Sequence, residues 1–389
     1  MHRKLRLGMV GGGKGSFIGA VHRIAARMDN EYELVCGAFS ATPGVSLSSG
    51  LELGIDPSRI YNSWNQMFET EHSLPPGIRM EVVAIVTPNH LHYEPAKLAL
   101  EMGIHVIMDK PMTLNLEEAL ALQEIVRNSG RLFCLTHTYT GYPMIKEARQ
   151  RISSGDFGTI RKVYVEYPQG WLSTPLENTG NKQAEWRADP TRNGIGGAMG
   201  DIGTHAFNMA EYVSGSKVKS VCADINKVVT GRLLDDDGTI LLKFENDATG
   251  VLIATQVAAG EENNIKVRIY GEKGGVEWQQ KNANTLLIKW PDKPAEVLRS
   301  GVNSQYLSTY ATSNCRTPSG HPEGYLEAFA NHYRNFARCI KAKQEGYIPE
   351  QEWLDYPGVE EGVRGMAFIE SVISSGNSSQ KWLPLTTSK

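Results

Sequence analysis

The stretch LRLGMVGGGKGSFIGAVHR, residues 5–23, decides the fold. Residues 5–10 form a near-continuous apolar run, which is typical of a strand buried on both faces. The glycines that follow let the backbone approach a pyrophosphate, whose charge then lies at the N-terminus of the next helix. With Gly11 and Gly13 as the first two glycines of the usual G-x-G-x-x-G, the third comes at Gly19, three residues late. A glycine cluster also suits a plain turn, but the strand and helix around it favour a dinucleotide site.

The same alternation of strand and helix continues to about residue 140. Helical patterns at 94–102 and 115–128 separate further apolar runs, which are typical of buried parallel strands. A repeated strand-helix-strand order predicts an α/β fold with a doubly wound parallel sheet, a Rossmann domain over residues 1–140. The further runs are residues 32–39, 81–88, 105–110 and 132–137.

After about residue 160 the pattern changes to β-rich runs in succession. Ile265, Val267 and Ile269 alternate with charged residues, which is typical of a sheet with one face in water. Helical patterns at 323–342 and 359–375 follow. Residues 141–389 are therefore predicted to form a C-terminal α/β domain with a large, mostly antiparallel open sheet. Its predicted strands are 161–169, 219–229, 239–246, 249–257, 264–271, 275–280 and 285–290.

The composition excludes several classes of protein. A chain of 389 residues exceeds one ordinary domain, and a net charge of −3 gives no basic field for nucleic acid or an anionic membrane. No apolar run approaches the roughly 20 residues that span a bilayer. Five cysteines are scattered singly, which favours buried free thiols in a reducing compartment. Because the N-terminal apolar run passes straight into glycines, it indicates a strand rather than a leader, and we expect a cytoplasmic protein.

Three further segments take the interpretation beyond a general fold. VTPNHLH (86–92) and MDKP (108–111) each end a predicted strand, and GGAMGDIGTH (196–205) opens a helix in the second domain. With the glycine loop and GHPEGYLEAFANHYRNF (320–336), this ordered set resembles the Gfo/Idh/MocA family, named for glucose-fructose oxidoreductase, inositol dehydrogenase and the rhizopine-catabolism protein. The resemblance covers nearly the whole chain. It departs from the family in a longer glycine loop and in Asp-Lys-Pro where Glu-Lys-Pro is more frequent.

The resemblance implies a nicotinamide-dependent enzyme that oxidises or reduces sugars and polyols. It also implies that residues 141–389 form the substrate-binding and oligomerisation domain. Its open sheet is expected to join subunits into a homodimer or homotetramer. Lys110 corresponds to the family's active-site lysine, and Asp201 and His205 to its acidic and histidine pair. The resemblance further implies a cis peptide between Lys110 and Pro111, which the small cis penalty of bonds before proline permits.

These three residues suit the oxidation of a secondary alcohol. Positions four apart on a helix share a face, so Asp201 and His205 are expected to point together into the cleft. Histidine takes up a hydroxyl proton near neutral pH, and Asp201 holds a substrate hydroxyl or supports the imidazolium. Lys110, at the carboxyl end of a parallel strand, stabilises negative charge on the reacting oxygen. Without the other motifs, an Asp and a His at this spacing are more often a helix cap and a surface histidine, or a core histidine whose ring nitrogens are hydrogen-bonded.

Cofactor contacts are expected from the loops at the carboxyl ends of the parallel strands. Ser40 ends the second strand with neither Asp nor Arg beside it, which leaves NAD and NADP both open. His90 and His92 lack an accompanying carboxylate cluster, so we expect packing and cofactor contact there and no metal. The candidate cofactor-binding residues are Gly11, Gly13, Gly15, Phe17, Ile18, Ser40, Thr87, Pro88, Asn89, His92, Lys110 and Pro111.

Aromatic residues mixed with amides and charges in 136–143 and 166–190 mark the expected substrate wall. Such a surface stacks on the C–H face of a sugar and hydrogen-bonds its hydroxyls. The three acids at 235–237 are expected to form a solvated turn rather than a metal site. The candidate substrate-binding residues are Tyr139, Gln169, Trp171, Lys182, Trp186 and Arg187, beside Asp201 and His205.

Two alternatives to a freely exchanging dehydrogenase stay open. One is an enzyme that keeps its nicotinamide bound, and either exchanges hydride between two sugars or loosens a glycosidic bond by transient oxidation. The other, from a different class, is a non-catalytic nucleotide-binding regulator on the same fold. The presence of Lys110, Asp201 and His205 together argues against the regulator, because a sensor has no need of all three.

Overall fold

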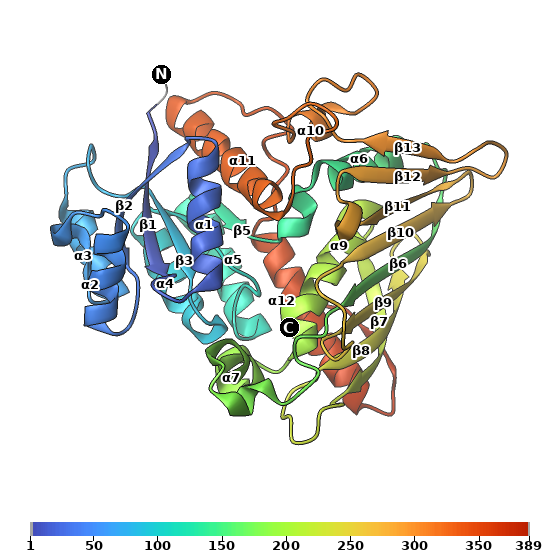
Figure 1. Cartoon of the computed structure of the whole chain (residues 1–389), viewed down its shortest axis with the longest axis horizontal. Helices are drawn as coiled ribbons and strands as arrows, with labels where there is room; N and C mark the ends of the chain where they lie inside the picture. The colour runs from blue at the N-terminus through green and yellow to red at the C-terminus, as the bar shows by residue number, and fades with distance from the viewer. Residues whose placement is uncertain (1–2, 388–389) are drawn as a thin grey trace. The chain divides into compact units, whose positions relative to one another are not determined.

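The first unit is built on a five-stranded parallel sheet in the order β2-β1-β3-β4-β5 (Figure 1). The computed structural model describes residues 3–387. Each neighbouring pair of strands in this sheet is parallel, which confirms the predicted doubly wound arrangement. The strands are β1 (Leu5–Gly11), β2 (Tyr32–Ala38), β3 (Val82–Val86), β4 (His105–Met108) and β5 (Phe133–Leu135).

Helices connect and cover these strands. Strand β3 is buried along its whole length, as a strand between two helical layers must be. Ser16 caps the first helix, because its Oγ accepts the backbone N–H of Gly19 at 3.2 Å. The helices are α1 (Phe17–Met28), α2 (Pro43–Glu52), α3 (Trp64–Ser73), α4 (Tyr93–Glu101) and α5 (Leu116–Ser129).

One helix from late in the chain also belongs to this unit. Residues 326–362 group with the chain up to Thr113 and with 117–138, whereas the expected division at residue 140 placed them in the second domain. The long helix α11 (Tyr325–Glu345) carries Tyr333, whose hydroxyl lies 2.7 Å from Nδ1 of His22 and whose carbonyl accepts the Tyr32 hydroxyl at 2.8 Å. These partners are more than 300 positions apart, so no local pattern indicated their contact.

Three buried histidines of this unit predict that the protein is sensitive to acid. Burial lowers the pKa of His22 and His105 to about 4, and that of His137 to about 3. The ordinary value is 6.5, so between pH 6.5 and 4 the unfolded chain binds more protons than the folded one. The free energy of unfolding therefore falls as the pH falls, by up to about 1.4 kcal/mol per pH unit for each histidine.

Denaturant midpoints measured at about pH 7.5 and about pH 5 check this expectation. A midpoint that stays constant or rises at the lower pH would contradict it. His22→Asn is expected to flatten the pH dependence, because it removes one buried imidazole. His72→Asn, at an exposed position in α3, is the matched control and should leave the dependence unchanged.

The second unit carries a nine-stranded sheet in the order β13-β12-β11-β10-β6-β9-β8-β7-β14. Within residues 3–387, only β6 and β9 of this sheet pair in parallel, so the predicted large and mostly antiparallel sheet is confirmed. Two short strands, β13 and β14, were not predicted. The strands are β6 (Ile160–Pro168), β7 (Val218–Asn226), β8 (Asp237–Phe244), β9 (Thr249–Thr255), β10 (Lys266–Gly271), β11 (Gly275–Gln279), β12 (Thr285–Lys289), β13 (Glu296–Arg299) and β14 (Trp382–Pro384).

Helices pack on one face of this sheet (Figure 1). Helix α6 (Pro143–Ser153) contacts β11 and β12, and α9 (Thr204–Ser214) contacts β6, β9 and β10. The rings of Phe207 in α9 and Phe368 in α12 (Val359–Asn377) stack with centroids 4.5 Å apart. The remaining short helices are α7 (Lys182–Ala188), α8 (Pro190–Asn193) and α10 (Thr309–Thr312). Among residues 3–387, no helix is long and apolar enough to cross a membrane.

Candidate active site

The glycine loop between β1 and α1 has the shape of a phosphate cradle. Gly11, Gly12 and Gly15 have φ values of +79°, +73° and +81°, a left-handed conformation that favours glycine. The backbone N–H of Gly13 donates to the carbonyl of Phe39 at 3.1 Å, and a Cβ at Gly13 would lie 2.7 Å from that oxygen. Because the loop ends at the N-terminus of α1, its amides fit the pyrophosphate of a dinucleotide.

Gly19 supplies the close packing that the third glycine of the usual motif supplies. A Cβ at Gly19 would lie 2.4 Å from both the Cα and the carbonyl oxygen of Gly12. Helix α1 therefore lies directly against the loop, and only glycine fits between them. The longer loop moves this glycine along the sequence without changing its function in packing.

Gly19→Ala is expected to weaken NAD binding by about tenfold or more, because the loop must move away from the helix, and to lower the free energy of unfolding by about 1–3 kcal/mol. Titration of NAD and thermal unfolding measure the two effects. Gly44→Ala is the matched control, since Gly44 lies in α2 with nothing within 4 Å of its added Cβ. Equal NAD affinity in both variants would contradict this account of Gly19.

The other candidate cofactor residues of this loop and of β2 differ in exposure. Phe17 is 69% exposed at the start of α1, an unusual position for a large apolar ring. Gly15 has nothing within 4 Å of an added Cβ, and Ile18 is half-buried. Ser40 is half-buried after β2, and its Oγ accepts the backbone N–H of Thr42 at 3.1 Å.

A buried histidine joins the loops that follow β3 and β4. Nδ1 of His92 lies 2.9 Å from the carbonyl oxygen of Pro111, and Nε2 lies 2.9 Å from that of Thr87. Burial lowers the pKa of His92 below its ordinary value. The ring therefore fixes the position of both loops, and the neighbouring Pro88 and Asn89 are half-buried and buried. The Lys110–Pro111 peptide is cis, as predicted.

Lys110 lies half-buried where β4 ends. Its backbone N–H donates to Oδ1 of Asp109 at 2.9 Å, and the Thr136 hydroxyl donates to the same oxygen at 3.1 Å. Asp109 thus holds the backbone that carries the lysine. Burial, and after it the nearby charge of Lys110, lower the pKa of His137 to about 3, so this imidazole stays neutral beside the lysine.

In the second unit, Asp201 lies in a π-helical turn, Met199–Gly203, and His205 lies in the α-helix α9 that follows. The regular α-helical turn expected across both residues is therefore wrong. The backbone N–H groups of Gly197 and Met199 donate to the two carboxylate oxygens of Asp235 at 2.6 and 2.7 Å. A Cβ at Gly197 would lie 2.0 Å from the Asp235 carbonyl oxygen, so the glycine permits this approach.

The acids at 235–237 are not the solvated turn that we expected from the sequence. Asp235 and Asp236 are buried, with 4% and 1% of their surface exposed. Burial raises the pKa of Asp235 to about 6. Asp236 accepts the N–H groups of Val228 and Val229 and pairs with Arg232 at 3.1 Å. The Asp235 carboxylate therefore fixes the backbone just before Asp201, and that of Asp236 fixes the backbone at Val228 and Val229.

Asp201 lies between an amide and a guanidinium. Nε2 of Gln256 donates to Oδ2 of Asp201 at 2.8 Å, and Nε of Arg187 forms an ion pair with the same oxygen at 3.3 Å. Gln256 follows β9 and is buried. Gln256 was not among the predicted site residues, although an amide directly after an apolar strand was a usable signal.

His205 is buried among tyrosines. Its ring packs edge to face on Tyr139 with centroids 5.0 Å apart, and the Tyr139 and Tyr167 hydroxyls are hydrogen-bonded. Tyr167 donates to Oδ1 of Asn263 at 2.8 Å, and Nδ2 of Asn263 donates to the Tyr139 hydroxyl at 3.1 Å. Burial raises the pKa of both tyrosines, so the phenols keep their protons at neutral pH. Tyr167 and Asn263 were missed by the sequence analysis.

The substrate-wall candidates extend this network. Oε1 of Gln169 accepts the indole N–H of Trp171 at 3.0 Å and the amide of Gln256 at 3.4 Å. The guanidinium of Arg187 lies 4.2 Å from the centre of the Trp186 ring and 5.8 Å from that of Trp171. The structure thus brings together every substrate-wall candidate except Lys182, which is exposed at the start of α7.

The comparison with protein families first defines the class. Residues 5–137 match the oxidoreductase family with an NAD-binding Rossmann fold, and residues 145–277 match the GFO/IDH/MocA C-terminal domain. The chain is therefore an NAD-binding oxidoreductase. It belongs to the Gfo/Idh/MocA family, which confirms the resemblance, and NAD is the cofactor of the Rossmann domain.

Solved and curated relatives agree with this membership. An oxidoreductase from Sinorhizobium meliloti is 44% identical, with a TM-score of 0.88 and coverage of 98% of this chain and 100% of that one. An inositol dehydrogenase homologue from Azotobacter vinelandii, solved with NADH and myo-inositol, is 33% identical, with a TM-score of 0.90 and coverage of 99% and 98%. Levoglucosan dehydrogenase from Pseudarthrobacter phenanthrenivorans is 28% identical over 78% of this chain and 80% of the relative.

Proposed function

We propose that the enzyme oxidises a ring hydroxyl of a cyclic polyol, sugar or glycoside to a ketone, and catalyses the reverse reaction. The observation that carries this proposal is the network around Asp201 and His205. It adds the amide of Gln256, the guanidinium of Arg187 and the phenol of Tyr139 to the carboxylate of Asp201 and the imidazole of His205. A site built to hydrogen-bond several hydroxyls discriminates strongly for a polyhydroxylated ring. The relative solved with myo-inositol supports the same class of substrate.

His205 is the proposed general base. It takes the hydroxyl proton in the oxidation and returns it in the reduction, because an imidazole exchanges protons near neutral pH. Asp201, fixed by Gln256 and Arg187, orients a substrate hydroxyl. The ammonium of Lys110 donates a hydrogen bond to the reacting oxygen and stabilises its developing negative charge. NAD held by the glycine loop would supply the acceptor for the hydride of the carbinol carbon.

The residues that would hold NAD are those of the glycine loop and of the strand ends. The left-handed glycines and the N-terminus of α1 would receive the pyrophosphate. Residues 38–45 contain no basic side chain that could bind a 2′-phosphate. Lys14 in the loop is paired with Glu52 at 2.7 Å. We therefore propose a preference for NAD over NADP.

The outer face of the nine-stranded sheet is the proposed subunit interface. Leu241 in β8 is 44% exposed and Val297 in β13 is 55% exposed, and exposed apolar side chains on one face mark sites of association. Light scattering that reports a dimer or tetramer supports this proposal, and a monomer at micromolar concentration argues against it. All five cysteines are free thiols, which supports the proposed cytoplasmic location.

A substrate screen tests the proposed function. The purified protein is mixed with NAD or NADP and with inositols, monosaccharides or glycosides, and the absorbance of reduced nicotinamide is recorded. The proposal expects NADH to accumulate with at least one cyclic polyol or sugar. Nicotinamide that co-purifies without net accumulation would instead favour hydride exchange on a retained cofactor. Binding of NAD without turnover on any substrate would favour a regulator.

A further inference from the structure

A second cavity lies at the opposite edge of the parallel sheet from the glycine loop. Its volume is about 190 Å³, which is room for several water molecules or a small oxyanion. Glu81 immediately precedes β3, His105 begins β4 and Arg131 lies just before β5, and all three line the cavity. Because the strands are parallel, this amino edge is remote from the carboxyl edge where NAD binds.

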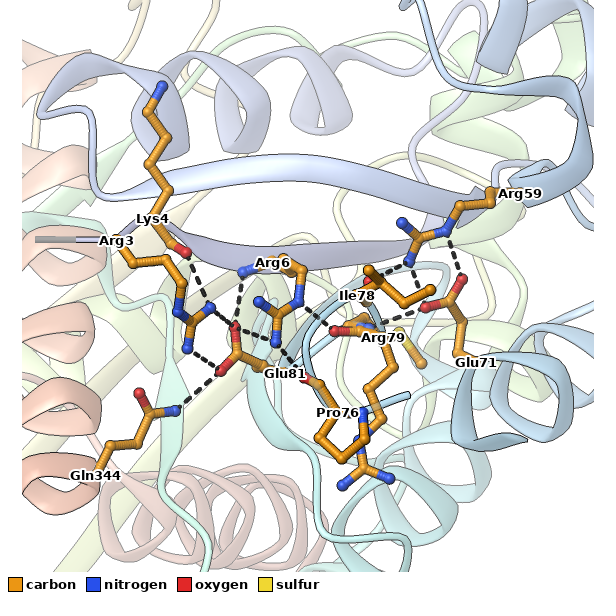
Figure 2. Close-up of polar contacts among 11 residues, drawn as sticks. Arg3, Lys4, Arg6, Arg59, Glu71, Pro76, Ile78, Arg79, Glu81 and Gln344 are labelled. Atoms are coloured by element: carbon orange, nitrogen blue, oxygen red, sulfur yellow. Dashed lines mark hydrogen bonds and ion pairs between the residues drawn. The ribbon is translucent and has the colours of Figure 1, made fainter. Parts of the chain in front are cut away.

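The two carboxylates at this cavity are already satisfied (Figure 2). Glu71 accepts hydrogen bonds from Nε of Arg59 at 2.9 Å, from the Tyr61 hydroxyl at 2.9 Å and from the backbone N–H of Met80 at 2.9 Å. Glu81 is similarly surrounded. It accepts from both terminal nitrogens of Arg3 at 2.6 and 2.7 Å, from Arg6 N at 3.2 Å and from Gln344 at 3.2 Å. Any further cationic side chain at the cavity therefore finds both lining carboxylates, Glu71 and Glu81, already engaged.

Two such cations line the cavity. Among residues 3–387, the guanidinium groups of Arg79 and Arg131 form no hydrogen bond or ion pair, and no dashed line reaches that of Arg79 in Figure 2. Nε of Arg131 is buried without a hydrogen-bond partner. A buried donor left unpaired lowers the free energy of unfolding by about 1–3 kcal/mol. A bound ligand that accepts a hydrogen bond from Arg131 would remove this cost.

His105 adds a third donor. Only 3% of its surface is exposed, and its Nδ1 accepts the backbone N–H of Leu132 at 3.0 Å. The neutral ring must then carry its proton on Nε2. Met80, Met102 and Ile104 supply an apolar part of the same wall. The cavity thus combines two free guanidinium forks, one imidazole N–H and an apolar side.

We propose that this cavity binds a phosphate group, either as inorganic phosphate or as the phosphate of a small phosphomonoester. Guanidinium forks match the oxygen geometry of phosphate and form charge-assisted hydrogen bonds with it. Arg79 and Arg131 hold the phosphate oxygens, and Nε2–H of His105 donates to a third. The apolar side accommodates the carbon part of a monoester. Such a ligand would connect the beginnings of β4 and β5 at a site separate from the proposed oxidation.

The test uses the full chain saturated with NAD, so that the glycine loop is occupied and cannot bind phosphate. Inorganic phosphate is titrated by calorimetry, with sodium chloride at equal ionic strength as the reference. We expect saturable binding and, at about ten times the Kd, a rise in Tm of about 2–4 °C. A parallel titration with glycerol 3-phosphate distinguishes the sources: tighter binding indicates a monoester, and equal or weaker binding indicates free phosphate.

Variants locate the binding. Arg131→Gln and Arg79→Gln are each expected to weaken phosphate binding by about tenfold or more. Arg127→Gln is the matched control, because Arg127 lies in α5, is 63% exposed and pairs with Glu124. If Arg131→Gln does not fold, Arg79→Gln on the loop before β3 carries the test. Absence of saturable binding, or unchanged affinity in the folded variants, would overturn the proposal. The positive charge of these arginines would then serve only to stabilise the C-terminus of α4.

Discussion

Replacing His205 by alanine is expected to lower kcat for the oxidation by about 10²–10⁴-fold, the usual contribution of a positioned proton acceptor. The substrate hydroxyl then loses its proton only to water. NAD binding should be unchanged, because the cofactor cradle belongs to residues 5–137. Steady-state kinetics and NAD titration measure the two quantities separately. Added imidazole should restore part of the lost rate if His205 acts by proton transfer.

Two controls keep this prediction specific to catalysis. Because the His205 ring packs on Tyr139, thermal unfolding of the variant shows whether its tyrosine neighbours remain in place. His321→Ala removes an exposed imidazole from the same unit and should leave kcat unchanged. A folded His205→Ala enzyme with kcat near that of the original chain would exclude His205 as the base.

Lys110→Ala is expected to lower kcat by about 10²–10³-fold, since it removes a charged donor from the reacting oxygen. The loop should keep its shape, because Asp109 and Thr136 hold the backbone independently of the lysine side chain. Lys110→Arg is expected to retain more activity than the alanine variant. Its guanidinium preserves the positive charge but changes the donor geometry.

Lys4→Ala serves as the control for both Lys110 variants, because Lys4 is exposed and its ammonium points away from Arg3 and Arg6 in Figure 2. It should leave both kcat and NAD affinity unchanged. If Lys110→Ala lost NAD affinity and kept its kcat, the lysine would belong to cofactor binding alone. That outcome would contradict its proposed action on the substrate oxygen.

Local sequence patterns predicted the strands of both sheets apart from β13 and β14, whereas the cis Lys110–Pro111 peptide was expected from the family resemblance and is confirmed. They could do so because a buried parallel strand and a half-exposed antiparallel strand differ in their apolar periodicity. The short strands β13 and β14 were missed, since four and three residues give too little pattern. The membership of α11 in the first unit was also missed, because it depends on contacts of Tyr333 with residues far away in sequence.

The candidate site shows the same difference between local and long-range information. The sequence indicated Asp201 and His205 by residue type, but not the π turn between Met199 and Gly203. That turn is tied to Asp235, 36 positions away from Met199, through a backbone hydrogen bond. Gln256 and Asn263 were missed for a related reason. Each belongs to the site only through its hydrogen bond to a residue on another element, Asp201 for Gln256 and Tyr139 for Asn263.

The most direct test of the proposed mechanism is a double-mutant cycle with Lys110→Ala, His205→Ala and the double variant. The quantity measured is kcat/KM with NAD and the best substrate of the screen. If both residues act on one oxygen in one transition state, the double variant should lose much less than the product of the two single losses. Losses that multiply would show that the two residues act independently, and would contradict a shared reacting centre.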